Sequence, residues 1–217
     1  DDNYKRSPWY ENRDKIKSAR IKVKGMRNAA SLFYDCVNMT SVDLSEFDTS
    51  QVTNMSNMFE ACESLKELDL SSLNTSNVTR MSEMFYECKG LTTLDLTNFD
   101  TSSVKSMMSM FAGCTSLEKV DVSSFDTSNV TDMQYMFSEC ENLKSLDVSN
   151  FRTGKLDLAV GMFWHCSSLI GLDLSEFDFQ KIFRAGVLVT GDKNLTYLRT
   201  PKNFPEKPNQ DLELPGD

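Results

Sequence analysis

The sequence contains little of the chemistry that most enzymes use. Its 217 residues include one histidine, His165, although histidine is the most common general base near neutral pH. It has no phosphate-binding glycine loop, no nucleophile elbow and no histidine cluster with metal-binding spacing. These absences predict a protein that is not an enzyme and that carries no cofactor.

Clustered positive charge and long apolar runs are also missing. Lysine and arginine number 23 against 32 aspartates and glutamates, which gives a net charge of -9 at pH 7. Nucleic-acid binding requires clustered cations, so we expect no nucleic-acid partner. No segment approaches the ~18 apolar residues of a membrane span. The polar start at residues 1–5 resembles the interior of a longer protein, so the lack of a signal peptide there leaves secretion open.

What the sequence has in abundance is repetition. Six cysteines recur every 26 residues, at Cys36, Cys62, Cys88, Cys114, Cys140 and Cys166. Each is followed by a leucine three residues on, except Cys36, which is followed by Met39, and by a motif close to Leu-Asp-Leu-Ser from six residues on. Met-Phe or a variant stands just before the next cysteine. The period and the apolar spacing match the leucine-rich-repeat template.

Buried free thiols are the predicted state of these cysteines. Equivalent residues of stacked repeats lie roughly 5 Å apart, but their side chains point in parallel, which is against disulfide geometry. No pair has the two- to four-residue spacing of a zinc site. Oxidation of one or two neighbouring pairs is the alternative.

The order of residues in each unit predicts a strand followed by a helix. Alternation around Leu-Asp-Leu indicates a short strand with its aspartate facing outward. Asp-Thr-Ser-Asn then offers helix-capping oxygens, and Val78, Met81, Met84, Phe85 and Cys88 have the spacing of one helix face. The predicted fold is therefore an α/β leucine-rich-repeat solenoid, with a parallel sheet of short strands on one face and short helices on the other.

The predicted organisation has three parts. Residues 1–35 form an N-terminal cap and a half repeat, and the cap ends in a strand at Ile21–Val23. Residues 36–191 form the array of 26-residue units, of which the last is degenerate. Residues 192–217 form a C-terminal cap and an extended segment rich in proline.

An acidic row along the sheet face is the candidate binding site. It consists of the aspartates at the middle of the predicted strands, namely Asp43, Asp69, Asp95, Asp121, Asp147 and Asp173. These carboxylates are either solvated and bonded to the hydroxyl two residues on, or they accept a cationic protein surface, a glycan or calcium. A second row at the turn, which includes Asp48, Asn74, Asp100 and Asp126, is explained by capping and turn bonds.

The repeat unit resembles the BspA-like leucine-rich repeats of surface proteins and lipoproteins from Gram-positive bacteria and mycoplasmas. The motif is nearly intact from Leu94 to Cys114 and from Val120 to Cys140, and the resemblance extends over about residues 21–200. It implies an extracellular, wall-attached or lipid-anchored protein with a role in adhesion to host proteins, mucus or other cells. It brings no catalytic motif with it.

Two functions remain open from the sequence. One is an interaction or adhesion module that binds a protein or glycan of the host or of a neighbouring cell. The other is a structural spacer of a larger surface protein, which calcium could stabilise. Binding hot spots are rich in Trp, Tyr and Arg, and the candidates for such anchors are Tyr86, Tyr135, Trp164 and Arg152. We expect a monomer.

Overall fold

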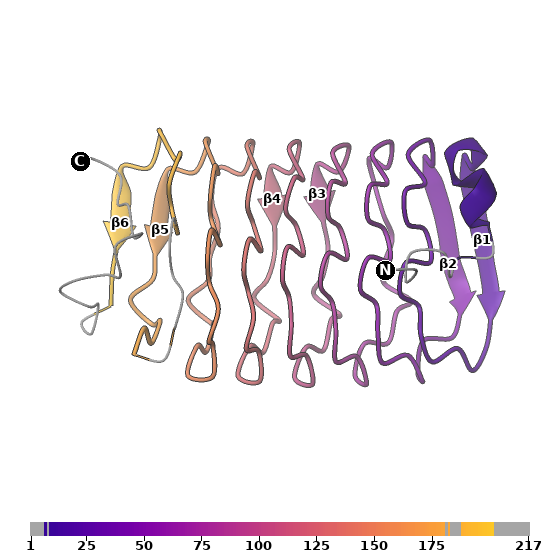
Figure 1. Cartoon of the computed structure of the whole chain (residues 1–217), viewed down its shortest axis with the longest axis horizontal. Helices are drawn as coiled ribbons and strands as arrows, with labels where there is room; N and C mark the ends of the chain where they lie inside the picture. The colour runs from indigo at the N-terminus through magenta and orange to yellow at the C-terminus, as the bar shows by residue number, and fades with distance from the viewer. Residues whose placement is uncertain (1–6, 8, 181, 183–187, 202–217) are drawn as a thin grey trace.

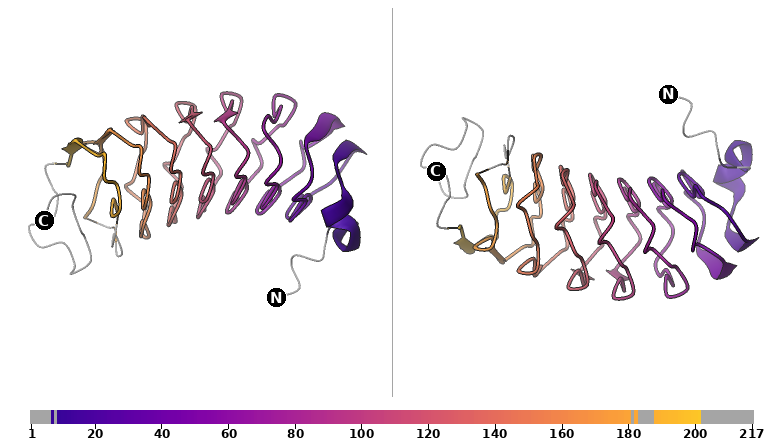
Figure 2. Two further views of the ribbon diagram at one scale, coloured as in Figure 1. Left: turned by 90° about the horizontal axis from the view of Figure 1, so that it is seen from above. Right: turned by 90° about the horizontal axis from the view of Figure 1, so that it is seen from below.

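The chain winds into a solenoid in which each 26-residue unit makes one coil. The computed structural model describes residue 7, residues 9–180, residue 182 and residues 188–201. The coils lie side by side in a gently curved row (Figures 1 and 2). Residues 26 apart pair in parallel from coil to coil, at Asn28, Asn54, Arg80, Ser106, Asp132 and Leu158. The predicted in-register stacking is confirmed.

The regular elements are few and short. They are the 3-10 helix η2 (Tyr10–Lys15) and the strands β1 (Ser18–Val23), β2 (Ser41–Phe47), β3 (Thr93–Leu94), β4 (Lys119–Val120), β5 (Gly171–Asp173) and β6 (Tyr197–Arg199). The strands pair in parallel as β1 with β2, β3 with β4 and β5 with β6. In the described part of the chain, no helix is long and apolar enough to span a membrane. The extended segment predicted beyond residue 201 lies outside the described residues.

The strands of the central coils are shorter than the sequence predicts, and an aspartate directly follows each of them. Asp95 directly follows β3, and its Oδ1 accepts the amide of Thr97 at 3.0 Å. Asp121 follows β4 and accepts the amide of Ser123 at 3.0 Å. Asp43 makes the same bond to Ser45 inside β2, so this turn bond accompanies both long and short strands. The described residues form three two-stranded sheets instead of one continuous sheet.

The predicted helices are wrong. From Met81 to Cys88 the chain forms successive turns, and no α-helix is present among the described residues. The amides of Glu83 and Glu87 donate to the carbonyls of the next coil, at Met108 and Ala112, both at 2.8 Å. The intervening amide of Tyr86 bonds within its own coil, to the Glu83 carbonyl at 3.2 Å. A right-handed helix is impossible here because Glu83 and Glu87 have φ values of 58° and 53°.

This arrangement keeps the apolar spacing that suggested a helix. The left-handed residues recur every four positions within a coil and every 26 residues between coils, at Ser31, Asp35, Asn57, Ala61, Glu83, Glu87, Ser109, Gly113, Tyr135, Glu139, Gly161 and His165. Between them the apolar side chains still point to one side. Two columns of methionine are fully buried, namely Met55, Met81, Met107 and Met133, and Met58, Met84, Met110 and Met136. Sequence periodicity of three and four residues therefore does not distinguish the two conformations.

A column of phenylalanines runs through the core. The rings of Phe33, Phe59, Phe85, Phe111, Phe137 and Phe163 stack with centroids 5.3 to 5.9 Å apart. Trp9 ends the column at the N-terminal side, with its ring 5.7 Å from that of Phe33. The cap thus covers an aromatic surface that would otherwise face water.

The cysteines are buried, as predicted, but they also donate hydrogen bonds. Each thiol from Cys62 onward bonds to the carbonyl of the phenylalanine 29 residues earlier; the Cys88 Sγ lies 3.0 Å from the Phe59 oxygen. That carbonyl also accepts the amide of Cys62 at 3.1 Å. The thiol therefore satisfies a second lone pair that the neighbouring coil leaves free.

Buried threonines connect the coils at the turn. The Thr75 hydroxyl donates to the Asp100 carbonyl at 2.9 Å and accepts the Asp100 amide at 2.8 Å. Thr49 makes the same pair of bonds to Asn74, at 2.9 and 2.7 Å. These threonines are at most 2% exposed. The Asp-Thr-Ser-Asn segment, which was expected to cap a helix, therefore fastens one coil to the next.

Replacing Thr75 with valine should lower the free energy of unfolding by about 2–4 kcal/mol, because the Asp100 amide and carbonyl both lose a buried partner. Thr75→Ser keeps the hydroxyl and should cost about 1 kcal/mol, from the lost methyl group. Urea denaturation of both variants gives the comparison. Equal losses in the two would contradict a role for the hydroxyl.

The thiols should react slowly with thiol reagents in the folded protein. Burial raises the pKa of Cys36 to about 11 and that of Cys114 to about 12, so little thiolate forms near neutral pH. A thiol-reactive chromogenic disulfide should label the native chain slowly and all six cysteines after unfolding in guanidinium chloride. Rapid labelling before unfolding would show that the coils open readily.

Candidate functional site

The predicted acidic row lies on the surface, and arginines neutralise its two ends. Asp43 pairs with Arg20 of β1 at 2.9 Å, and Asp173 pairs with Arg199 of β6 at 3.4 Å. Each arginine stands beside its aspartate in the parallel register of the strands. The four central members are exposed and have no ion pair among the described residues; they are Asp69, Asp95, Asp121 and Asp147.

Each aspartate of the row uses one oxygen to hold its own turn. In Asp95 the Oδ1 accepts the Thr97 hydroxyl at 2.7 Å and the Thr97 amide at 3.0 Å. These bonds lower the pKa of Asp95, because they favour the charged form. The bonding to the residue two positions on that the sequence predicts is therefore present, and the Oδ2 atom remains available to solvent or a ligand.

The row is not a preformed metal site. Among the described residues, no three Asp, Glu, His or Cys side chains come close enough to hold a metal ion together. Between Asp95 and Asp121 lies a shallow depression that is also lined by Lys119. Lys119 helps to lower the pKa of Asp121, after the bonds from Ser123.

The second polar row, at the turn, is used internally. Asp100 accepts the Ser102 amide at 3.0 Å and the Ser102 hydroxyl at 2.6 Å. In the fifth unit, Arg152 replaces the aspartate, and Lys155 donates to the Asn129 side chain at 2.6 Å. This confirms the predicted turn bonds.

A second surface, the turn face, differs from coil to coil. It consists of the left-handed turn segments at residues 30–35, 56–61, 82–87, 108–113, 134–139 and 160–165. Their exposed positions carry unlike side chains in successive coils, including the candidate anchors Tyr86, Tyr135 and Trp164. Variation of this kind gives each stretch of the face its own chemistry.

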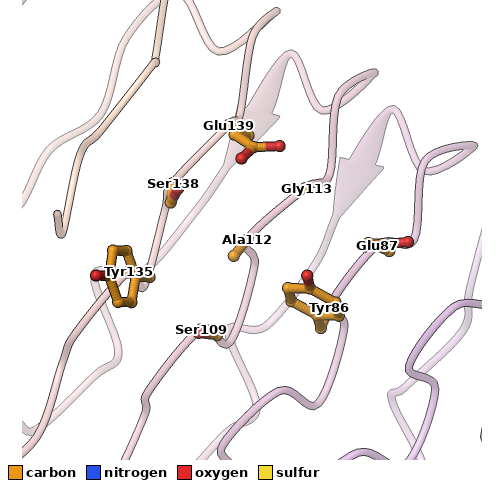
Figure 3. Close-up of a pocket in the computed structure, with 8 residues that line it drawn as sticks. All are labelled: Tyr86, Glu87, Ser109, Ala112, Gly113, Tyr135, Ser138 and Glu139. Carbon is orange, nitrogen blue, oxygen red and sulfur yellow. The ribbon is translucent and has the colours of Figure 1, made fainter. Parts of the chain in front are cut away.

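One stretch of the turn face is hollowed. Three successive coils line a depression of about 180 Å³, in which the middle coil contributes Ser109, Ala112 and Gly113. Tyr86 lies on one side and Tyr135 on the other (Figure 3). The sequence indicated each tyrosine separately as a candidate anchor, but it did not indicate that the two side chains line the same site. The sequence feature that could have indicated the shared site is the set of small residues Ser109, Ala112 and Gly113 in the middle coil, at positions where the preceding coil has large residues.

Next to the hollow lie a buried carboxylate, Glu60, and a half-buried one, Glu83. Glu60 is 9% exposed, and burial raises its pKa to about 7, helped by the charges of Glu83, Glu87 and Asp35. The Asn57 amide donates to both Glu60 and Glu83, in the latter case at 2.8 Å. One amide thus links the carboxylates of two adjacent coils.

Glu60 should make the protein less stable as pH rises. Its folded pKa is above the ordinary value of 4.5, so its contribution is full below that value and is lost as pH rises through about 7. Glu60→Gln should therefore raise the free energy of unfolding by about 1–3 kcal/mol near pH 8 and change it little near pH 4.5. Urea denaturation at the two pH values measures this.

Glu67→Gln is the matched control, because it removes an equal charge from an exposed position. It should change stability by less than about 0.5 kcal/mol at both pH values. A Glu60→Gln effect that is the same at both pH values would contradict the assignment.

Comparison with known proteins agrees with the repeat architecture. The family described as "Mycoplasma protein of unknown function, DUF285" matches residues 10–95 and 91–196. No similar sequence was found among curated proteins.

Several solved structures of bacterial leucine-rich repeat proteins are similar over most of the chain. The protein from T. pallidum is 15% identical, with a TM-score of 0.40, over 87% of this chain and 72% of its own. A leucine-rich cell surface protein from Faecalibacterium prausnitzii is 14% identical, with a TM-score of 0.42, over 85% of this chain and 59% of its own. The protein from Eubacterium ventriosum is 16% identical, with a TM-score of 0.34, over 91% and 76%.

The family match covers most of the chain, and it confirms the resemblance seen in the repeat motif. The chain therefore belongs to the DUF285 family, whose repeats are of the BspA leucine-rich type.

Proposed function

We propose that this chain is a non-catalytic interaction module of a bacterial surface protein, which binds a protein or glycan of a host or neighbouring cell through an exposed face of the solenoid. The observation that carries the proposal is the acidic row. Its ends are paired with arginines, whereas its four central carboxylates have no cation partner among the described residues. Exposed carboxylates without an ion pair can interact with a partner surface that carries positive charge or hydrogen-bond donors.

The regular spacing of the row supports an extended contact. Parallel coils stand roughly 5 Å apart, so the four central carboxylates form a line about 15 Å long. Each has one oxygen fixed by its own turn, which orients the other. An oriented row loses less conformational freedom on binding than mobile side chains would. The extracellular location is part of this proposal and is supported by the resemblance to BspA-like repeats.

A structural spacer is the second candidate, and one observation favours it. Backbone hydrogen bonds join each coil to the next from Ala29 to His165, which makes the array a continuously bonded rod. A spacer needs that stiffness and no specific surface. The two functions therefore make different predictions: the interaction module needs the exposed carboxylates for binding, whereas the spacer does not.

Removing two central charges should weaken binding if the row is used. In Asp95→Asn/Asp121→Asn the amide oxygen still accepts the turn amide, as Asn74 does from Ser76 at 3.1 Å. The matched control is Asp100→Asn/Asp126→Asn, which removes equal charge from the turn row. We expect the first pair to lower retention of a labelled epithelial surface-protein extract and of purified mucin about threefold or more, with a smaller effect at high salt.

The control pair should retain both probes as the wild type does. Equal retention by all three proteins would remove the acidic row from the proposal. No retention of either probe by the wild type would favour the spacer.

A further inference from the structure

We propose that the hollow on the turn face binds one cationic side chain of a partner protein, an arginine or a lysine, between Tyr86 and Tyr135. The inference deepens the proposed function and rests on it, because it names a second contact and the chemistry of the partner. The site differs from the acidic row in its residues and in its surface.

The hollow exists because the middle coil carries small residues where the preceding coil carries large ones. Ala112 occupies the position that Tyr86 and Tyr34 occupy in other coils, and Gly113 occupies that of Glu87. The space of about 180 Å³ is smaller than the roughly 300–1,000 Å³ of a pocket for a drug-sized ligand. It therefore suits a single side chain.

The lining of the hollow is complementary to a cation. Glu87 and Glu139 contribute carboxylates, and no lysine or arginine lines it. Lys89 already pairs with Glu63 at 2.7 Å and with Glu87 at 3.3 Å. Glu139 has no ion pair among the described residues, so its carboxylate is the one open to an incoming charge. The two tyrosine rings, on either side in Figure 3, offer faces that attract cations.

The chain contains an arginine bound in the equivalent way. Asp35 holds the position of Glu87 and Glu139 in the first coil, and Arg13 of the N-terminal cap pairs with it at 2.6 Å. The Arg13 guanidinium also lies 4.3 Å from the centre of the Tyr10 ring, which stacks against Tyr34. A carboxylate at this position next to aromatic rings thus already binds a guanidinium in this fold.

Glycines in the next coil set the shape of the hollow. A Cβ atom at Gly161 would lie 2.6 Å from the Tyr135 ring, so only glycine leaves room for the ring there. A Cβ at Gly113 would lie 3.0 Å from the Glu87 Cγ. Gly161 therefore leaves space for the Tyr135 ring, and Gly113 leaves space for the Glu87 side chain.

Fluorescence anisotropy with labelled Gly-Ser-Arg repeat peptides tests the proposal. Matched peptides with lysine, and with the neutral analogue citrulline, separate charge from shape. The arginine peptide should bind the wild type about tenfold more tightly than the citrulline peptide, with the lysine peptide between them. Glu139→Gln should weaken arginine-peptide binding about threefold or more.

Ala112→Tyr fills the hollow with the residue that Tyr34 and Tyr86 provide at equivalent positions, so the fold can accommodate it. It should reduce binding about tenfold or more, and thermal unfolding checks that the variant is folded. If Ala112→Tyr does not fold, the arginine-peptide affinity of Glu139→Gln tests the proposal instead. Asp100→Asn/Asp126→Asn, which removes two charges from the turn row, should leave the affinity within about twofold at physiological salt, because screening limits the reach of those charges.

Equal binding of the arginine and citrulline peptides would overturn the proposal, and so would wild-type affinity in both hollow variants. Binding of a neutral oligosaccharide that Ala112→Tyr abolishes, without arginine-peptide binding, would also overturn it and assign the hollow to a sugar. Loss of extract binding in Asp95→Asn/Asp121→Asn without any arginine-peptide binding would leave the proposed function standing and remove only the hollow.

Discussion

The backbone ladder between coils is the constraint on which the rest of the structure depends. In the turn segments, every second amide donates to a carbonyl 25 residues ahead, as Asn57 does to Ser82 and Phe59 to Met84. The ladder fixes the spacing of the coils and their register at once. It also excludes a helix, because the amides that a helix would use internally are committed to the neighbouring coil.

The buried columns follow from that register. Once equivalent residues are aligned, phenylalanine stacks on phenylalanine, and each thiol reaches the carbonyl of the coil before it. Thr49, Thr75 and Thr127 each bond both the carbonyl and the amide of the next turn. The last residue of each column has no equivalent residue beside it, so a different residue covers it. Trp9 covers the end of the aromatic stack, and Arg20 and Arg199 pair with the two end members of the acidic row.

The two exposed surfaces divide the chemistry between them. The acidic row repeats, and part of each aspartate is used to form its own turn, so its regularity serves the fold as well as any partner. The turn face does not repeat, because its side chains project from a backbone whose amides bond alternately to the next coil and within their own coil, whatever those side chains are. Positions such as Ala112 are therefore free to vary, and a small residue there leaves a hollow between larger ones.

The uninterrupted repeat was enough to predict the 26-residue period, the stacked register, the buried cysteines and the outward-facing aspartates, because it places equivalent residues in line. The turns in place of helices, and the hollow between Tyr86 and Tyr135, became visible only in the folded chain. Apolar spacing of three and four residues fits both conformations. The bonds that select between them join different coils, so no single repeat contains the information.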